Sequence, residues 1–246
     1  MNTRKTYFIS DLHLDQNHPK TINLFTRFLA QCDHTTDCIY ILGDLFEVYI
    51  GDDDRNHLQT TVIKSLKEAC ARGINIYYMH GNRDFLISDY FLRESGCHLL
   101  AEESVINLYG QQVLLMHGDT LCSNDHAYMR ARCILRNPFS KWFFLQLPLS
   151  LRMKIANRLR EKSKQYTQTT TLATMDVVQE TVEEKISAHQ VNYLIHGHTH
   201  QPSLHQFMLQ QPKQRWVLGA WHDHAIILVW DQNQHVELID IMNIHS

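Results

Sequence analysis

Long apolar runs are absent from this sequence of 246 residues. No stretch approaches the ~20 consecutive apolar residues that a membrane-spanning helix needs. The charged opening Met1–Lys5 leads directly into the short run Tyr7–Ile9, so we also expect no signal or transit peptide. Internal repeats and low-complexity segments are absent, and 9 glycines and 5 prolines are too few for a collagen-like chain.

Cysteine pairing motifs are absent too. The six cysteines show neither a C-x-x-C pair nor the regular spacing of a disulfide framework, which excludes a small disulfide-stabilised fold. We expect them to be reduced thiols of a cytosolic protein. One of them, Cys122, is expected to be a buried bystander beside a motif described below. The six are Cys32, Cys38, Cys70, Cys97, Cys122 and Cys133.

The composition is that of an ordinary globular chain with an excess of histidine. Hydrophobic residues make up 44% and charged residues 20%, which suits one medium-sized domain, or one domain with a sizeable insertion. There are 17 histidines against 16 aspartates and 10 glutamates. Histidine is the commonest metal ligand and the usual acid or base near neutral pH. Any single histidine is more often a polar surface residue, so position in the chain must separate the functional ones.

The formal net charge of -3 conceals a strongly basic segment. The stretch from Ser123 to Gln165 holds ten of the 23 basic residues and only two acids, Asp125 and Glu161. This stretch therefore carries +8, and the rest of the chain carries -11. The ten basic residues are Arg130, Arg132, Arg136, Lys141, Arg152, Lys154, Arg158, Arg160, Lys162 and Lys164.

Short apolar runs that end in polar residues recur along the chain and predict buried strands. Segments of helix length lie between them, among them Pro19–Gln31 and Asn56–Arg72, and this alternation indicates a layered α/β sheet. Near the C-terminus, the runs Trp216–Leu218, Ala225–Trp230 and Val236–Ile241 predict antiparallel hairpins. The buried strands are expected at Thr6–Ser10, Cys38–Leu42, Ile74–Met79, Gln112–Met116 and Val191–Ile195.

A basic, helix-forming segment interrupts the strand pattern at residues 123–185 and contains the aromatic and leucine-rich run Trp142–Leu149. We interpret this segment as a helical cap insertion. The core is then predicted to consist of residues 1–122 and 186–246.

Five short motifs follow the predicted buried strands. Each is weak alone, because short Asp- and His-containing motifs arise by chance in such a sequence. Their order is informative, because residues that follow the strands of an α/β sheet converge on a shared crevice. Glycine flanks four of the five and lets the backbone turn sharply beside a ligand. The motifs are Asp11-Leu12-His13, Gly43-Asp44, Gly81-Asn82-Arg83-Asp84, His117-Gly118-Asp119 and Gly197-His198-Thr199-His200.

The candidate ligands in these motifs are two carboxylates, one amide and four imidazoles. Oxygen and nitrogen donors without thiolate suit Mn, Fe or Zn at a hydrolytic site. Seven ligands exceed the needs of one ion and suit two ions roughly 3.5–4 Å apart that share a carboxylate, which favours in-line displacement at phosphorus. The alternative is a satisfied polar network without metal.

The ordered series D-x-H, G-D, G-N, H-G-D and G-H-x-H, from Asp11 to His200, resembles the calcineurin-like metallophosphoesterases. The resemblance implies an α/β fold in which a β-sandwich is flanked by helices, with a dinuclear site at the strand ends. It also implies that Asp44 bridges the two metals. The first metal would be held by Asp11, His13 and His200, and the second by Asn82, His117 and His198.

Longer stretches around the motifs narrow the resemblance to one branch of that family. Gly43–Asp54, His80–Ile87 and His117–Cys122 are similar to the enzymes that cleave the pyrophosphate bond of a UDP-linked diacylated glucosamine lipid in lipid A biosynthesis. The resemblance implies two Mn²⁺ ions per chain and attack of water on the α-phosphorus. The products would be UMP and a diacylated glucosamine 1-phosphate, and we expect a monomer.

Arg83 stands where the G-N motif of many relatives continues with His. The resemblance implies catalytic roles for Asn82, Arg83 and His198, and an arginine fork suits phosphate oxygens. The alternative is that Arg83 simply pairs with Asp84. Substrate contacts are implied for Asn82, Arg83, Asp125, Ser163, Thr167, Thr170 and His198.

The cap insertion departs from the family pattern at two of these positions. Relatives tend to carry Asn and Lys where this sequence has Thr167 and Thr170. A missing lysine weakens a phosphate or sugar contact, and Lys164, about one helical turn away, is a candidate substitute. His80 and His196 flank the ligand series and are expected to orient its members.

Basic residues mixed with bulky apolar ones favour contact of the cap insertion with an anionic membrane surface and with acyl chains. The resemblance correspondingly implies a peripheral location on the cytoplasmic face of the inner membrane. The alternative is a cap whose apolar face packs on the core while Arg and Lys point to water. Nucleic acid is a rival partner for the +8 charge, but no binding motif for it is present, so we expect none.

Two other functions stay open. The first keeps the chemistry but changes the substrate: a soluble nucleotide phosphodiesterase or dinucleoside polyphosphate hydrolase. The second is a scaffold that keeps the fold without catalysis. Such a scaffold should lack some metal ligands, and this sequence lacks none.

Overall fold

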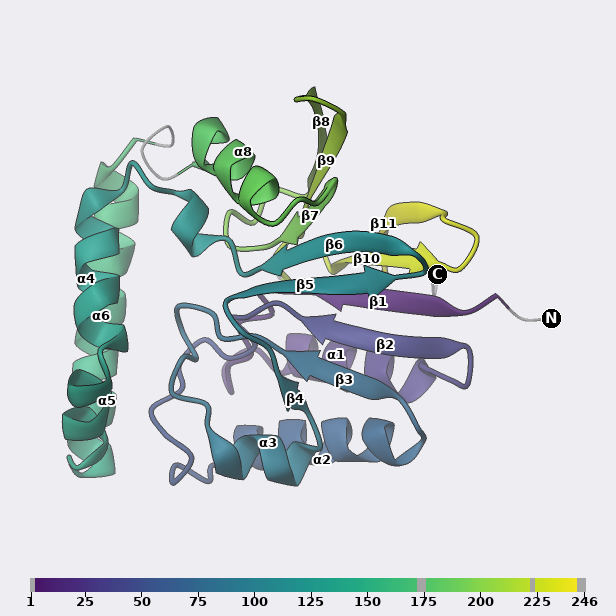
Figure 1. Cartoon of the computed structure of the whole chain (residues 1–246). Helices are drawn as coiled ribbons and strands as arrows, with labels where there is room; N and C mark the ends of the chain where they lie inside the picture. The colour runs from purple at the N-terminus through teal and green to yellow at the C-terminus, as the bar shows by residue number, and fades with distance from the viewer. Residues whose placement is uncertain (1–2, 172–175, 222–223, 243–246) are drawn as a thin grey trace.

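Two β-sheets lie face to face at the centre of the molecule, and helices cover their outer faces (Figure 1). The computed structural model describes residues 3–171, 176–221 and 224–242, except for the side chain of Thr167. The prediction of a layered α/β fold is confirmed.

The first sheet has six strands in the order β11-β10-β1-β2-β3-β4. The four strands from β1 to β4 are parallel, whereas β10 runs antiparallel to β1 and forms an antiparallel pair with β11. The strands are β1 (Lys5–Ile9), β2 (Thr36–Ile41), β3 (Asn75–Tyr78), β4 (His98–Leu99), β10 (Ile226–Asp231) and β11 (Val236–Asp240).

The second sheet has five strands in the order β5-β6-β7-β9-β8. Its three central strands, β6, β7 and β9, are parallel, and the edge strands β5 and β8 are antiparallel to their neighbours. The strands are β5 (Glu103–Leu108), β6 (Gln111–Met116), β7 (Tyr193–His196), β8 (Ser203–Met208) and β9 (Pro212–Val217).

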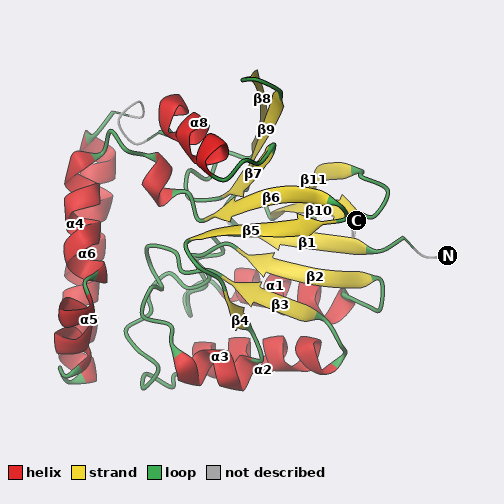
Figure 2. Cartoon of the chain, viewed as in Figure 1, coloured by secondary structure: helices red, strands yellow, loops and turns green. Residues whose placement is uncertain are grey.

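Three helices cover the outer face of the first sheet, and one covers the second (Figure 2). The first three are α1 (Pro19–Gln31), α2 (His57–Ala71) and α3 (Asp89–Ser95), and the fourth is α8 (Gln179–Ala188). The start of α2 is fixed by Asn56, whose side chain accepts a hydrogen bond of 2.9 Å from the backbone N–H of Gln59.

The side chains of β6 point alternately to the two faces of the second sheet, and both faces are covered. Val113 and Leu115 lie in the apolar cluster between the two sheets. Leu114 and Met116 point to the other face and pack in the cluster that contains α8. Since successive side chains of a strand point to opposite faces, a strand with apolar residues throughout is buried on both sides.

Helices α4 (His126–Arg136), α5 (Pro138–Leu145) and α6 (Leu149–Thr169), here called the cap helices, stand beyond the ends of the strands (Figure 1). They lie beyond the carboxyl ends of the central strands and cover neither sheet face. No helix in the described ranges is both long enough and apolar enough to cross a bilayer.

The predicted strands are present, with their ends shifted by up to four residues. Of the predicted C-terminal hairpins, β10 and β11 form one. The other is wrong, because β9 lies in the second sheet, between β7 and β8, and does not pair with β10. Three strands were missed: β4, β5 and β8. The predicted cap insertion, residues 123–185, contains most of α8, which packs on the second sheet through Val182 and Ile186. The boundaries of core and cap insertion stay a prediction.

Candidate metal centre

The side chains of the five motifs meet at the carboxyl ends of β1, β2, β3, β6 and β7. Asp11 and Asp44 are almost completely buried, His13 and His117 are also buried, and His200 is exposed. The segments that carry them come from both sheets, so the two sheets together form the site.

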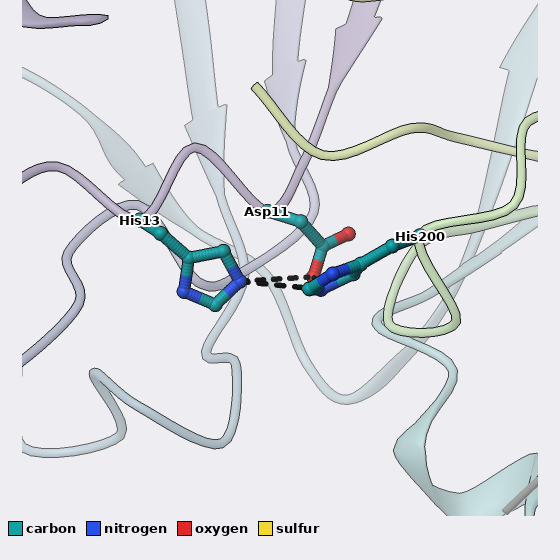
Figure 3. A group of neighbouring side chains, drawn as sticks. All are labelled: Asp11, His13 and His200. Carbon is teal, nitrogen blue, oxygen red and sulfur yellow. Dashed lines mark hydrogen bonds and ion pairs between the residues drawn. The ribbon is translucent and has the colours of Figure 1, made fainter. Parts of the chain in front are cut away.

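Asp11, His13 and His200 form the first group, and Figure 3 shows them pointing toward one another. His200 Nε2 lies 3.3 Å from Asp11 Oδ1 and 3.2 Å from His13 Nε2. Asp11 Oδ1 is buried and accepts no hydrogen bond of good geometry from the described residues. A buried carboxylate oxygen left in this state fits a metal ligand.

Asn82, His117 and His198 form the second group. Asn82 Oδ1 lies 2.9 Å from His117 Nε2 and 3.1 Å from His198 Nδ1. The other ring nitrogen of His117, Nδ1, lies 2.8 Å from the carbonyl oxygen of Leu42, so Nε2 is the nitrogen directed into the site.

Asp44 lies between the two groups. Its Oδ2 is 3.8 Å from His13 Nε2, and its Oδ1 is 3.9 Å from His117 Nε2. One carboxylate therefore faces both groups, as a bridging ligand must. The side chains present fit two divalent cations, which Asp11, Asp44 and the five other predicted ligands would hold.

Close approach of the backbone is possible because the motif glycines lack a Cβ. A Cβ on Gly81 would lie 2.1 Å from Asp44 Oδ1, and a Cβ on Gly197 would lie 2.2 Å from Asp11 Oδ2. Both distances are far inside van der Waals contact, so any side chain at these positions would displace a candidate ligand.

Five of the seven predicted ligands have left-handed backbone conformations: Asp11, His13, Asp44, His198 and His200, with φ between 47° and 70°. This region is uncommon for residues other than glycine. Strained conformations of this kind cluster at functional sites, where the surrounding structure holds them.

The electrostatics of the site favour a cation. Burial alone would lower the pKa of His13, but Glu47, Asp44 and Asp11 raise that pKa to about 9. Burial likewise opposes protonation of His117, yet the same two aspartates raise its pKa. The carboxylates thus attract positive charge onto neighbouring rings, and a divalent cation would supply that charge in place of the protons. Burial and His117 lower the pKa of His198 to about 4, so its ring is neutral.

Asp84 was not predicted to have a role of its own, and it holds two of the site loops together. Its buried carboxylate accepts backbone hydrogen bonds from Leu45 at 2.7 Å and from Gly81 at 2.9 Å. Asp84 makes no ion pair with Arg83 among the described residues, so the alternative of a simple Arg83–Asp84 pair is wrong.

Arg83 lies at the edge of the site. Its backbone N–H donates to Asp44 Oδ1 at 2.8 Å. Its side-chain Nε is buried and has no hydrogen-bond partner in the described part of the chain. The guanidinium therefore has capacity to bind an anion.

The two flanking histidines contact the backbone. His80 Nε2 lies 2.8 Å from the carbonyl oxygen of Ile87. Arg215 Nη1 donates to His196 Nε2 at 3.1 Å, so the proton of the neutral ring is on Nδ1, 2.9 Å from the carbonyl oxygen of Gly197. His196 thereby supports the loop that carries His198 and His200.

The predicted substrate contacts in the cap lie on or beside α4 and α6. Asp125 precedes α4 and accepts hydrogen bonds from the backbone N–H of Tyr128 at 2.9 Å and from Tyr166 Oη at 2.8 Å. Ser163 is exposed on α6, and Thr170 immediately follows that helix. Thr167 belongs to α6, and its side chain lies outside the described part of the chain. No described contact joins these four residues to the candidate ligands.

Two carboxylates connect the site to the cap helices, and the sequence did not predict this role for either of them. Asp119 accepts hydrogen bonds from Tyr128 Oη and Arg132 Nε, both at 2.7 Å. Glu47 lies between His13 and Arg160. The H-G-D motif contained Asp119, and the spacing of Arg132 and Arg136 on one helix face was an available signal for its partners.

Residues 4–202 match the calcineurin-like phosphoesterase family, which covers most of the chain and all of the motifs. The chain belongs to this family of metal-dependent hydrolases, as the resemblance predicted. Among solved structures, the chain is similar to a novel archaeal phosphodiesterase, with 12% identity and a TM-score of 0.49 over 96% of this chain and 99% of the other.

Two curated relatives are more similar in sequence. The UDP-2,3-diacylglucosamine hydrolase of Escherichia coli O7:K1 (strain IAI39 / ExPEC) is 49% identical over 218 residues, which covers 88% of this chain and 91% of the relative. The enzyme of the same name from Shigella flexneri has the same identity and coverage.

Proposed function

We propose that this chain binds two Mn²⁺ ions and hydrolyses the pyrophosphate bond of UDP-2,3-diacylglucosamine. The observation that carries the proposal is the placement of Asp44, whose two oxygens face His13 in one ligand group and His117 in the other. Similarity over most of the chain to hydrolases named for this substrate supports the choice of substrate. Bound divalent cations would supply the positive charge, and the lowered pKa of water, that displacement at phosphorus requires.

The chain's own residues would bind and orient the pyrophosphate. The buried, unpartnered Nε of Arg83 and the neighbouring Asn82 lie where phosphoryl oxygens would bind. A permanently charged fork at this position stabilises negative charge that develops in the transition state. The neutral ring of His198 completes this set. Attack of water on the α-phosphorus would give UMP and 2,3-diacylglucosamine 1-phosphate.

The cap helices would bind the sugar and lipid parts of the substrate. Contacts from Asp125, Ser163, Thr167 and Thr170 would hold the diacylated glucosamine, with Lys164 in place of the family lysine. Tyr166 brings the last turn of α6 to Asp125, which supports a common binding surface for these residues.

Exposed aromatic residues on α5 support a role for the cap helices at an anionic membrane. Phe139, Trp142 and Phe143 are 82%, 63% and 64% exposed, and none of the described residues of α5 is buried. Phe144 of the same helix packs, half-buried, against the apolar cluster of the core, whereas the other three aromatic side chains face away from it. We assign the protein, as a monomer, to the cytoplasmic face of the inner membrane, where aromatic side chains and basic residues would hold it.

The test is UMP release from UDP-2,3-diacylglucosamine in detergent micelles by the purified chain loaded with Mn²⁺. Activity should disappear with a chelator, return when Mn²⁺ is restored, and rise when anionic vesicles present the substrate. Absence of UMP release by the metal-loaded protein would refute the proposed substrate. Metal analysis that finds well under two ions per chain would refute the dinuclear site.

A further inference from the structure

Glu47 is a single carboxylate with two contacts that point in different directions. Its Oε2 lies 2.7 Å from His13 Nδ1, and its Oε1 lies 2.7 Å from Arg160 Nε on α6. The Glu47 side chain is only 15% exposed. One carboxylate thus connects a candidate metal ligand of the core to a cap helix.

Backbone hydrogen bonds fix Glu47 beside His13. The N–H of His13 donates to the carbonyl oxygen of Asp44 at 3.0 Å, and the N–H of Leu14 donates to that of Leu45 at 3.0 Å. The N–H of Glu47 then donates back to the carbonyl oxygen of Leu14 at 3.1 Å. The loops after β1 and β2 therefore run side by side, and the position of Glu47 does not depend on its side chain alone.

The contact with Glu47 determines which ring nitrogen of His13 enters the site. The carboxylate of Glu47, 2.7 Å from Nδ1, favours the proton on that nitrogen, so Nε2 retains a lone pair for a ligand. Nε2 is the atom that lies 3.8 Å from Asp44 Oδ2 and 4.0 Å from Asp11 Oδ1. Carboxylates that hold a metal-binding imidazole in this way orient the ring and raise its basicity.

We propose that Glu47 is a positioning residue for the metal ligand His13 and that Arg160 couples α6 to the metal site through Glu47. The inference rests on the proposed metal site. A cation bound by His13 and a docked α6 then stabilise one another, and by linkage each raises the affinity of the other by the same factor.

Arg160 has a competing role that the test must separate. Its side chain is 42% exposed, so it could instead bind a phosphate of the substrate directly. In that case, loss of Arg160 would lower activity but leave Mn²⁺ affinity unchanged. The two roles therefore differ in a quantity that can be measured without substrate.

The experiment is a Mn²⁺ titration of the full chain, in which electron paramagnetic resonance detects the free ion. Glu47→Gln should raise the Kd of the weakened site roughly 10–100-fold, as for other residues that orient metal ligands. Arg160→Met should raise it about 3–10-fold, and in the Glu47→Gln background it should have no further effect, since it acts through Glu47. Arg158→Met, on the same helix and exposed, should leave both Kd values unchanged.

A second measurement tests whether Mn²⁺ binding at the site stabilises α6. Mn²⁺ should slow hydrogen exchange of the α6 amides in the wild-type chain and in Arg158→Met, but much less in Arg160→Met. If Glu47→Gln does not fold without metal, Glu47→Asp, which keeps the charge but shortens the reach, should raise the same Kd.

The outcomes distinguish this inference from the proposed function. If the wild-type chain binds two Mn²⁺ ions and Glu47→Gln binds them equally well, the positioning role is wrong while the proposed function stands. If Arg160→Met weakens Mn²⁺ binding by the same factor with and without Glu47, the coupling through Glu47 is wrong. A wild-type chain that binds no Mn²⁺ overturns the proposed function and this inference together.

Discussion

The two sheets of the core pack through apolar clusters, whereas the cap helices contact the core mainly through charged and polar side chains. Leu115, Ile195 and Leu228 are completely buried between the sheets. In contrast, no described residue of α4 or α5 is buried, and among the described side chains of α6 the buried one is a cation, Arg152.

Each cap contact has its own partner in the core. Arg152 Nη1 donates to Asp53 Oδ1 at 2.8 Å and to the carbonyl oxygen of Ile50 at 2.7 Å. Arg132 reaches Asp119, and Arg160 reaches Glu47. Exclusion of water therefore holds the core, while a few directional contacts and the half-buried Phe144 of α5 attach the cap. Loss of one such contact should lower the local stability of the cap helices and leave the stability of the core unchanged.

The largest expected effect is a loss of catalytic activity, because all of the candidate metal ligands lie in the core and none in the cap helices. Asp44→Asn removes the charge that both ligand groups share, so UMP release should fall at least about 10³-fold, or roughly 4 kcal/mol. Asp89→Asn, at an exposed position of α3, is the matched control and should keep full activity. Activity of Asp44→Asn within tenfold of the wild type would contradict the bridging role.

The next effect concerns stability of the core. Leu115→Ala opens a cavity between the sheets and should lower the free energy of unfolding by about 2–5 kcal/mol. Urea unfolding followed by circular dichroism measures this change. A loss below about 0.5 kcal/mol, the usual range of surface substitutions, would show that the cluster between the sheets contributes little.

A smaller effect, confined to the cap, is expected for Arg152→Met. The change leaves the carbonyl oxygens of buried Ile50 and half-buried Leu147 without their donor, and the full cost of about 1–3 kcal/mol applies only to the buried one. Limited proteolysis within residues 123–171 should become faster while the urea midpoint of the core stays unchanged. Lys154→Met, exposed on the same helix, should change neither. A midpoint shift as large as that of Leu115→Ala would remove the distinction between the two regions.

The smallest effect on stability is expected at the exposed aromatic residues. Phe139→Ser should change the free energy of unfolding by less than about 0.5 kcal/mol. If Phe139 inserts into a membrane, the same change should weaken sedimentation with anionic vesicles roughly tenfold, because the apolar ring is no longer buried there. Met208→Ser, which alters an exposed apolar residue at the tip of β8, should leave vesicle binding unchanged.

The sequence predicted the strands that are buried on both faces, together with the half-buried edge strand β11, and missed three strands that are more exposed. Cys38–Leu42 and Gln112–Met116 are continuous apolar runs because both faces of β2 and β6 are covered. The missed strands β5 and β8 lie at the edges of the second sheet and are mostly exposed or half-buried, so neither contains such a run. The two residues of β4 are both exposed.

The candidate ligands were predictable because each follows a buried strand in a short motif. Their supporting residues were not, because their partners are distant in sequence. Asp84 holds the backbone of the loop after β2, and Glu47 contacts a helix of the cap insertion. No local pattern around either residue indicates such a partner. The contact that joins Arg160 to Glu47 follows only from the position of α6 beyond the strand ends.

Left-handed backbone at Asp11, His13, Asp44, His198 and His200 places a limit on how this chain can evolve. Each such residue costs the fold about 1 kcal/mol that a glycine would not. Selection for the ligands and selection for stability therefore oppose one another at these five positions. A descendant that lost its need for the metal would relieve this strain with glycine, but at Asp44 and Asp11 glycine would also remove the acceptors of the backbone N–H groups of Arg83 and His198.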